Sequence, residues 1–477
     1  MMDDALRTNA VDILGRLPLS LEMPAGTGKT QLVAAIAAVA WESNRRTLVL
    51  THTHAGVDAI RRRLKLLGVP ARTVQIATIT GWAFDLVRSY PLIAEVQVPE
   101  IPDWTRSPEY VAGAVRVARS KAISYMHAVS FDYFIVDEYQ DCNENQHELV
   151  LAIADAIPKT CLLGDRLQGI FGFGGEKLVD WDAHVVERFP LHPQEHKAWR
   201  WQGHNEELGK WLLEIRPGLL NREPLDLSTV CVSGFEWKSP DPTAITAAAL
   251  QSRPDGESVL VLGQWAPDVN DLARKLQGVY GVMEELQGKF MVEFLDSIDN
   301  AQSSDYAYLL AKFAKECFSG ASRLDRALLD KLKSGHTVSY LKRDGLEAVQ
   351  AALDELVLDP SLTGISVAMS SIAVAPGLRV FKREAWFDTR KAIDDATVGD
   401  GVTAVDALGR IRDALRHSGR RPAKRVVSRT LLVKGLEYDH VIVANADGLT
   451  DYRNLYVALT RGRKTLTVFS RSSRIGF

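Results

Sequence analysis

The feature that most constrains the fold of this chain is a glycine-rich turn between an apolar strand pattern and an alanine-rich helix pattern. The turn reads "EMPAGTGKT" at residues 22–30 and follows "LPLSLEM", in which apolar residues alternate. After the turn, "TQLVAAIAAVAW" is apolar on most sides, as a buried helix would be. A strand, a phosphate-binding turn and a helix in this order predict an α/β nucleotide-binding domain. The alternative is a chance glycine turn before a helix.

The loop departs from the usual phosphate-binding pattern at one position. The pattern G-x-x-x-x-G-K-[ST] has glycine where this chain has Met23. Met23 precedes Pro24, and a residue before proline adopts an extended conformation that needs no glycine. Gly26 and Gly28 supply the backbone freedom that wrapping phosphates requires. We therefore expect an intact site whose nucleotide-binding residues are Ala25, Gly26, Thr27, Gly28, Lys29 and Thr30.

Composition sets wide limits on the class of protein. The 477 residues exceed one ordinary domain, and 46% hydrophobic with 25% charged residues is typical of a soluble globular protein. No run of about 18 apolar residues predicts a membrane span, and the acidic N-terminus does not resemble a secretory signal. The four cysteines lack metal-ligand spacing and indicate reduced thiols of a cytoplasmic protein.

The overall charge of −3 does not indicate a nucleic-acid-binding protein, although a groove can be basic while the whole chain is not. One local run is strongly basic, "GRIRDALRHSGRRPAKRVVSR" at 409–429. It fits either a solvated helix face followed by a linker or a strip that contacts backbone phosphate.

A second motif supplies the carboxylates that nucleotide hydrolysis needs. The segment "FDYFIVDEYQD" (131–141) is an apolar strand that ends in acidic residues. Asp137 at the strand's end suits Mg²⁺ coordination together with Thr30, and Glu138 is placed to orient an attacking water. Between the two motifs, residues 45–64 and 74–90 each predict a strand, a turn and a helix, with Thr and His at the carboxyl ends of the strands, where open α/β sheets bind ligands.

Two further segments carry chemistry. In "TCLLGDRLQGIFGFGG" (160–175), Phe171 and Phe173 lie on a glycine-rich stretch, which suits stacking on nucleobases; core packing is the alternative. Near the C-terminus, "LLVKGLEYDHVIVANAD" (431–447) precedes "DYRNLYVALTRGRKTLTVFS" (451–470). Arg461 at the end of the latter helix fits an interdomain arginine finger or a cation that caps the helix.

Together, these segments resemble the motifs of the superfamily 1 helicases of the UvrD/Rep-like branch, from about Leu19 to Ser470. The matching segments, in family order, are "PAGTGKT", "THTHAGVDAI", "TITGWAF", "VDEYQD", "GDRLQGIFGF", "AWR" (198–200), "KGLEYD" and "LYVALTRGRK".

The resemblance implies roles for particular residues. Glu138 would be the catalytic base, Gln140 and Gln168 would sense the γ-phosphate, and Arg200 and Arg461 would stabilise the transition state. Gly435 and Glu437 would contact the γ-phosphate and ribose. The residues expected at single-stranded nucleic acid are Thr51, His52, Thr78, Thr80, Trp82, Phe171 and Phe173.

The chain departs from the family at four positions. It has no glutamine before Gln31 to read adenine, so we expect weak discrimination between ATP and GTP. The other departures are His52 for a phenylalanine, Gly174 for an arginine and Leu431 for a histidine.

The resemblance predicts an α/β fold of two RecA-like P-loop NTPase lobes with small helical insertions. The first lobe would comprise 1–90 and 131–227, with a reduced helical insertion at 91–130. The second would comprise 228–302 and 429–477, with a helical accessory insertion at 303–428.

The implied function is that of an ATP- and Mg²⁺-dependent helicase or translocase on single-stranded DNA, moving 3′ to 5′, in DNA repair or anti-phage defence. RNA stays open as the substrate. An alternative is an ATPase module that recruits a partner nuclease without unwinding. A small-molecule kinase would leave the KGLEYD and Arg461 segments unexplained.

Overall fold

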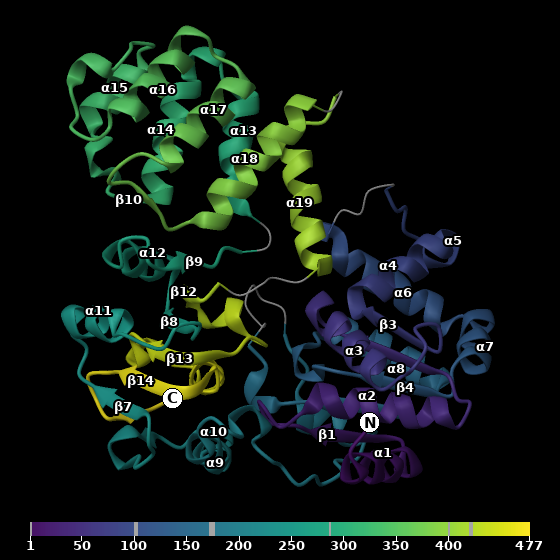
Figure 1. Cartoon of the computed structure of the whole chain (residues 1–477). Helices are drawn as coiled ribbons and strands as arrows, with labels where there is room; N and C mark the ends of the chain where they lie inside the picture. The colour runs from purple at the N-terminus through teal and green to yellow at the C-terminus, as the bar shows by residue number, and fades with distance from the viewer. Residues whose placement is uncertain (1, 100–103, 171–176, 286–287, 399–400, 419–422) are drawn as a thin grey trace.

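The computed structural model describes residues 2–99, 104–170, 177–285, 288–398, 401–418 and 423–477. It contains two parallel β-sheets, each covered by helices, and a separate helical cluster above the second sheet (Figure 1). The expected α/β class is therefore confirmed. None of the described helices combines the length and the apolar character that a membrane span needs.

The first sheet has five parallel strands in the order β1-β5-β4-β2-β3. Its strands are β1 (Leu19–Glu22), β2 (Thr47–Thr51), β3 (Val74–Thr78), β4 (Tyr133–Val136) and β5 (Thr160–Gly164). Side chains along each strand alternate between its faces. Thus Leu48 and Leu50 pack in one core and Val49 in the other. Both faces are buried, as a parallel sheet requires.

Helices cover both faces of this sheet. One face carries α1 (Asp4–Arg16), α2 (Lys29–Glu42) and α3 (His54–Leu66). The other carries α4 (Ile79–Ser89), α5 (Pro91–Ala94), α6 (Ser107–Arg119), α7 (Lys121–Ser130) and α8 (Glu144–Ala156). Within 91–130, the described residues form α5, α6 and α7, and the apolar face of α6, including Val111 and Val115, packs into the core of the first lobe. The helices expected as a reduced insertion therefore share the core of the first lobe.

The second sheet has six parallel strands in the order β7-β14-β13-β8-β12-β9. Its strands are β7 (Phe235–Lys238), β8 (Val259–Gly263), β9 (Gly281–Val282), β12 (Arg425–Arg429), β13 (Tyr438–Val443) and β14 (Gly462–Phe469). One face packs on α9 (Glu206–Glu214) and α20 (Tyr452–Leu459), the other on α11 (Pro242–Leu250) and α12 (Ala266–Lys275). The short helix α10 (Arg216–Leu220) follows α9, and β6 (Leu225–Asp226) pairs antiparallel with β15 (Arg474–Ile475).

The helical cluster has its own core and one short antiparallel pair, β10 (Phe318–Ser319) with β11 (Arg379–Val380). Its helices are α13 (Lys289–Asn300), α14 (Tyr306–Cys317), α15 (Arg326–Lys333), α16 (Glu347–Leu358), α17 (Leu362–Ala373), α18 (Arg383–Val398) and α19 (Ala404–Ser418). The expected boundaries at 303 and 428 are wrong at both ends. The apolar face of α13 packs in this cluster, and Val426 and Val427 of β12 lie in the second sheet.

Met23 lies in the core of the first lobe and is 5% exposed. Its N–H donates to Gly164 O at 2.7 Å, which extends the pairing of β1 with β5. The described non-glycine residues with positive φ are Asn44, Glu95, Glu138, Arg222, Gln277 and Lys342. Met23 thus keeps a negative φ, and position 23 has no need of glycine.

This geometry gives a first prediction for Met23→Gly. Nucleotide affinity should stay within about twofold, because the backbone at position 23 already has an ordinary conformation. Stability should fall by about 2–5 kcal/mol, because a buried methionine side chain is lost and glycine adds freedom to the unfolded chain. Thermal melting and a nucleotide titration measure the two effects. A tenfold gain in affinity would show that Met23 impairs the loop.

Candidate functional site

The phosphate loop joins β1 to α2 and has the backbone shape that its glycines allow. Gly26 and Gly28 have φ of 74° and 90°, values at which an L side chain is strained. A Cβ on Gly26 would also come within 2.6 Å of the Trp201 ring. Thr27 closes the turn by donating its hydroxyl to Pro24 O at 2.7 Å. The loop therefore forms an anion-binding concavity at the N-terminus of α2.

Lys29 begins α2 and meets the two carboxylates that follow β4. Its Nζ lies 2.7 Å from Glu138 Oε1 and 3.8 Å from Asp137 Oδ1. Burial raises the pKa of Asp137 to about 7, although Lys29 opposes the rise. Burial opposes ionisation of Glu138 too, but the ammonium groups of Lys29 and Lys434 outweigh it and lower the pKa of Glu138 to about 2. Glu138 is therefore an ionised carboxylate held by cations, in the position where a phosphate would compete for Lys29.

The backbone of Glu138 and its contact with Gln140 connect this carboxylate to the segment after β5. Glu138 has φ of 58° and ψ of 36°, a left-handed conformation that is costly for a non-glycine residue and clusters at functional sites. Gln140 Nε2 donates to Glu138 Oε2 at 2.5 Å, and Gln140 Oε1 accepts the Asp165 N–H at 2.9 Å.

Thr30 and Asp137 are the residues expected to hold Mg²⁺. Asp137 is 2% exposed, and Thr30 is half-buried in the first turn of α2. Within the described ranges, no three or more His, Cys, Asp or Glu side chains cluster in a way that could hold a metal ion. Mg²⁺ needs no such cluster, because it commonly binds one or two carboxylates together with substrate phosphates and water. The two residues therefore fit a cation that arrives with a nucleotide.

The two lobes meet at Gln168 and Arg461. Arg461 follows α20 and is fully buried. Its Nη2 lies 3.5 Å from Gln168 Oε1. Its Nε donates to Val457 O at 2.9 Å, and its Nη1 donates to Leu436 O at 3.0 Å. Burial and the neighbouring Arg200 lower the pKa of Arg461 to about 9. Arg461 therefore caps α20, as one interpretation of the sequence predicts, and at the same time reaches the first lobe.

Arg200 also contacts both lobes. Its N–H donates to Gly26 O at 3.1 Å, Nη1 donates to Thr460 O at 2.6 Å, and Nε donates to Glu437 Oε2 at 3.0 Å. Gly435 is exposed, with φ of 81°. The residues expected at the nucleotide therefore lie on both sides of one interface.

Lys434 is a cross-lobe residue that the sequence reasoning missed. Its Nζ lies 2.5 Å from Asp141 Oδ1 and also donates to Gln168 O. Burial raises the pKa of Asp141 to about 6, although Lys434 lowers it. The sequence could have indicated this contact, because both partners are motif residues. Lys434 is the lysine of KGLEYD, and Asp141 is the last aspartate of VDEYQD.

Trp199 is a second missed residue. It is 50% exposed, and its Cδ1 would lie 3.3 Å from a Cβ on Gly28. Lys197 Nζ lies 4.2 Å from the centroid of its ring. A half-exposed indole therefore lies beside the phosphate loop, where an aromatic surface can stack on a base.

Among the described residues, those expected to contact nucleic acid do not form one exposed surface. Thr51 is fully buried at the end of β2, and the Thr78 hydroxyl caps α4 by accepting the Gly81 N–H at 3.0 Å. Thr78 therefore serves the backbone of α4, Thr51 is enclosed in the core, and neither side chain lies on the surface of this structure. The side chain of Trp82 packs near His127 and Phe131.

The other expected contacts are divided. Thr80 is half-buried. His52 Nε2 lies 3.4 Å from Cys142 Sγ, and burial together with Lys434 lowers the pKa of His52 to about 3, so the imidazole is neutral. Phe171 and Phe173 lie outside the residues that the structure describes.

The basic run at 409–429 is divided between α19 and β12. Arg412 is 3% exposed and forms ion pairs with Glu384 and Asp388 inside the helical cluster. Arg410 is exposed on α19, and this helix packs against α3 of the first lobe (Figure 1). Residues 419–422 of the run lie outside those that the structure describes, so both interpretations of the run stay predictions.

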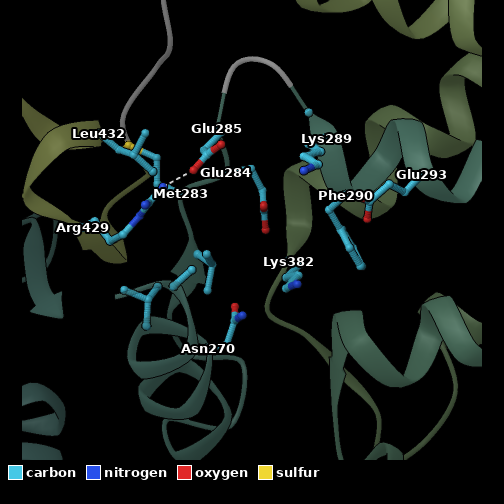
Figure 2. Close-up of a pocket in the computed structure, with 14 residues that line it drawn as sticks. Asn270, Met283, Glu284, Glu285, Lys289, Phe290, Glu293, Lys382, Arg429 and Leu432 are labelled. Atoms are coloured by element: carbon cyan, nitrogen blue, oxygen red, sulfur yellow. Dashed lines mark hydrogen bonds and ion pairs between the residues drawn. The ribbon is translucent and has the colours of Figure 1, made fainter. Parts of the chain in front are cut away.

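A pocket of about 330 Å³ lies between the second sheet and the helical cluster (Figure 2). Its charged lining residues are Lys289, Lys382, Arg429, Glu284, Glu285 and Glu293. Figure 2 shows the ion pair between Arg429 and Glu285 at one side. The charges of the three basic and three acidic side chains cancel, so the pocket has no net electrostatic attraction for a polyanion.

Two family models match the chain. The AAA domain matches residues 7–174, and the UvrD-like helicase C-terminal domain matches residues 432–469. Both matches support the resemblance to the UvrD/Rep-like superfamily 1 helicases. The first match contains the phosphate loop and the Asp137–Glu138 pair, and the second contains Lys434 and Arg461. Helicase-family domains of this kind indicate an ATPase that binds nucleic acid. No curated protein matches the chain.

Proposed function

We propose that this chain is an ATP-dependent helicase or translocase that moves 3′ to 5′ along single-stranded DNA in the cytoplasm, in DNA repair or anti-phage defence. The observation that carries the proposal is the contact of Arg461, a buried cation of the second lobe, with Gln168 in the segment after β5 of the first lobe. Groups from two lobes around one nucleotide couple its binding and hydrolysis to movement of the lobes.

ATP bound with Mg²⁺ would supply the phosphoanhydride bond that is hydrolysed. Lys29 would exchange Glu138 for phosphate, which frees the Glu138 carboxylate to accept a proton from the attacking water. Gln140 would hold that carboxylate in place, and Thr30 and Asp137 would bind the cation. Charge that develops on the phosphoryl oxygens would be stabilised by Arg200 and Arg461, because preorganised cations in a dry site act most strongly there. Gly435 and Glu437 would border the γ-phosphate and ribose.

A strand-displacement assay tests the movement. Duplexes with a 3′ or a 5′ single-stranded tail, of DNA or of RNA, are mixed with the intact protein and ATP. We expect displacement of the 3′-tailed DNA duplex only, with affinity for single strands that falls as salt rises, because binding releases counterions from phosphate. Displacement of only the 5′-tailed duplex would contradict the polarity, and displacement of only RNA would contradict the substrate.

The second candidate is an ATPase module that recruits or regulates a partner nuclease without unwinding. It is favoured by the packing of 91–130 into the core of the first lobe, because those described helices form no free-standing arm that could separate strands. Turnover stimulated by single strands, with no displacement of any tailed duplex, would support this candidate over the helicase.

We propose that Trp199 stacks on the nucleotide base. Stacking is worth about 1–3 kcal/mol by alanine substitution, so Trp199→Ala should weaken ATP binding by about tenfold or more.

Stacking without base-edge hydrogen bonds discriminates poorly between bases, so GTP should compete with ATP in the parent to within about tenfold. Competition in a turnover assay measures this. A preference for ATP of about a thousandfold would mean that another residue reads the base.

A further inference from the structure

A buried arginine outside the family motifs joins the two lobes beside the phosphate loop. Arg216 begins α10, and its side chain is 8% exposed. Its Nη2 lies 2.7 Å from Glu22 Oε1 and 2.8 Å from Asp165 Oδ1, and its Nη1 donates to the Tyr456 hydroxyl at 2.8 Å. Glu22 and Asp165 belong to the first lobe, whereas Tyr456 lies on α20 of the second. One guanidinium therefore holds acceptors from both lobes.

Asp165 connects this arginine to the nucleotide site. It is fully buried, and its Oδ2 accepts the Ala25 N–H of the phosphate loop at 3.0 Å and Gln168 Nε2 at 2.9 Å. Its Oδ1 accepts the Leu167 N–H at 3.1 Å. A buried carboxylate with this many donors is fixed in orientation, because charge-assisted hydrogen bonds in a low dielectric are strong. Asp165 thus links Arg216, through an ion pair and hydrogen bonds, to the phosphate loop and to Gln168.

Tyr456 connects the same arginine to Arg461. The ring of Tyr456 lies under the guanidinium, with Cζ of Arg216 5.1 Å from its centroid. It packs in a small apolar cluster with Ala25, Leu167 and Leu219. Tyr456 lies on α20, and Arg461 follows the C-terminal end of that helix. Since a helix of this length is rigid, fixing the position of Tyr456 also fixes the position of Arg461, which contacts Gln168.

We propose that Arg216 is a positioning residue for ATP hydrolysis, which fastens α20 to Asp165 and so sets Arg461 relative to the phosphate loop. The inference rests on the proposed function. Arginine suits the task because its planar fork presents five N–H donors in fixed directions, whereas a lysine ammonium is a single point charge. A lysine at 216 could keep the charge near Asp165, but it would lose the planar fork that serves Glu22, Asp165 and Tyr456 together.

The test compares the same substitution at two arginines that share Glu22. Arg166 also pairs with Glu22 at 2.7 Å, but its other partner is Asp182 of the first lobe. Arg216→Lys should lower kcat for ATP by about tenfold or more, because small misplacement of a reacting group is costly, and leave KM within about twofold. Arg166→Lys should leave both unchanged. Equal kcat for Arg216→Lys and the parent, or an equal loss in both variants, would overturn the inference.

Two more measurements separate positioning from general stability. Tyr456→Phe removes only the hydroxyl that accepts from Arg216, and it should lower kcat in the same direction without a further loss when combined with Arg216→Lys. Hydrogen exchange of the nucleotide-free protein should be faster in α20 of Arg216→Lys than in the parent, and unchanged in Arg166→Lys. Unchanged exchange in α20 would sink the fastening role. This readout needs no turnover, so an inactive parent would refute the proposed function and leave the fastening role to be decided by exchange.

Discussion

Replacing Arg461 with alanine should lower ATP turnover by about 10³-fold or more, the loss typical of removing an arginine that stabilises a transferring phosphoryl group. Nucleotide affinity should change little, because Arg461 contacts Gln168 and backbone carbonyls in the nucleotide-free protein, and its proposed charge stabilisation is needed only in the transition state. Steady-state hydrolysis and a nucleotide titration measure the two quantities.

The control for this prediction is Arg463→Ala. Arg463 lies two residues further along, and its Nη2 donates to Asp439 Oδ1 at 2.9 Å within the second lobe. The Arg463→Ala variant should retain ATP turnover to within a few-fold of the parent rate. Arg461 is buried, so Arg461→Lys is made in parallel to keep the charge and limit the loss of stability. Normal hydrolysis by a folded Arg461→Ala protein would contradict the assignment of a site shared between two lobes.

Replacing Lys434 with methionine should destabilise the protein by about 3–5 kcal/mol, because removing one partner of a buried ion pair leaves the other uncompensated. The partner is Asp141, which is 5% exposed. Burial already raises the pKa of Asp141 to about 6, and losing Lys434 should raise it further. A raised pKa in the folded state favours folding at low pH and loses that contribution as pH rises through it, so the variant should regain stability as pH falls.

The control for Lys434 is a double-mutant cycle with Asp141→Asn. If the ion pair is the source of the effect, Lys434→Met should cost less in the Asp141→Asn background than in the parent. Thermal melting from about pH 5 to 8 records both comparisons. Equal cost in the two backgrounds, or a cost independent of pH, would show that Lys434 stabilises the protein by packing alone.

The parts of the site that follow from local pattern could be predicted from the sequence. The strand, turn and helix around Gly26, Gly28 and Lys29 are adjacent in the chain, and the apolar stretch that ends at Val136 places Asp137 and Glu138 at the carboxyl end of a strand. The pre-proline argument for Met23 is local as well. In each case the geometry depends on neighbours within a few residues, which a single sequence displays.

The parts that depend on packing between distant segments could not be predicted in this way. Lys434 and Arg216 have their roles only because the second lobe rests against the first, and neither partner lies near them in the chain. Thr51 and Thr78 were expected at nucleic acid, but polarity at a strand end does not reveal whether a side chain faces solvent, is buried as Thr51 is, or caps a helix as Thr78 does. The strand β12 was missed because basic residues flank its short apolar stretch.

The measurement that tests the central claim most directly is ATP hydrolysis with and without single-stranded DNA. The intact protein and its Lys29→Ala variant are assayed at low salt with Mg²⁺. We expect slow hydrolysis by the parent alone, stimulation of at least about tenfold by single strands, and no turnover by the variant, which lacks the ammonium that binds phosphate. Hydrolysis that single strands, of DNA or RNA, leave unchanged would contradict a nucleic-acid-dependent ATPase, and hydrolysis that survives Lys29→Ala would contradict the site itself.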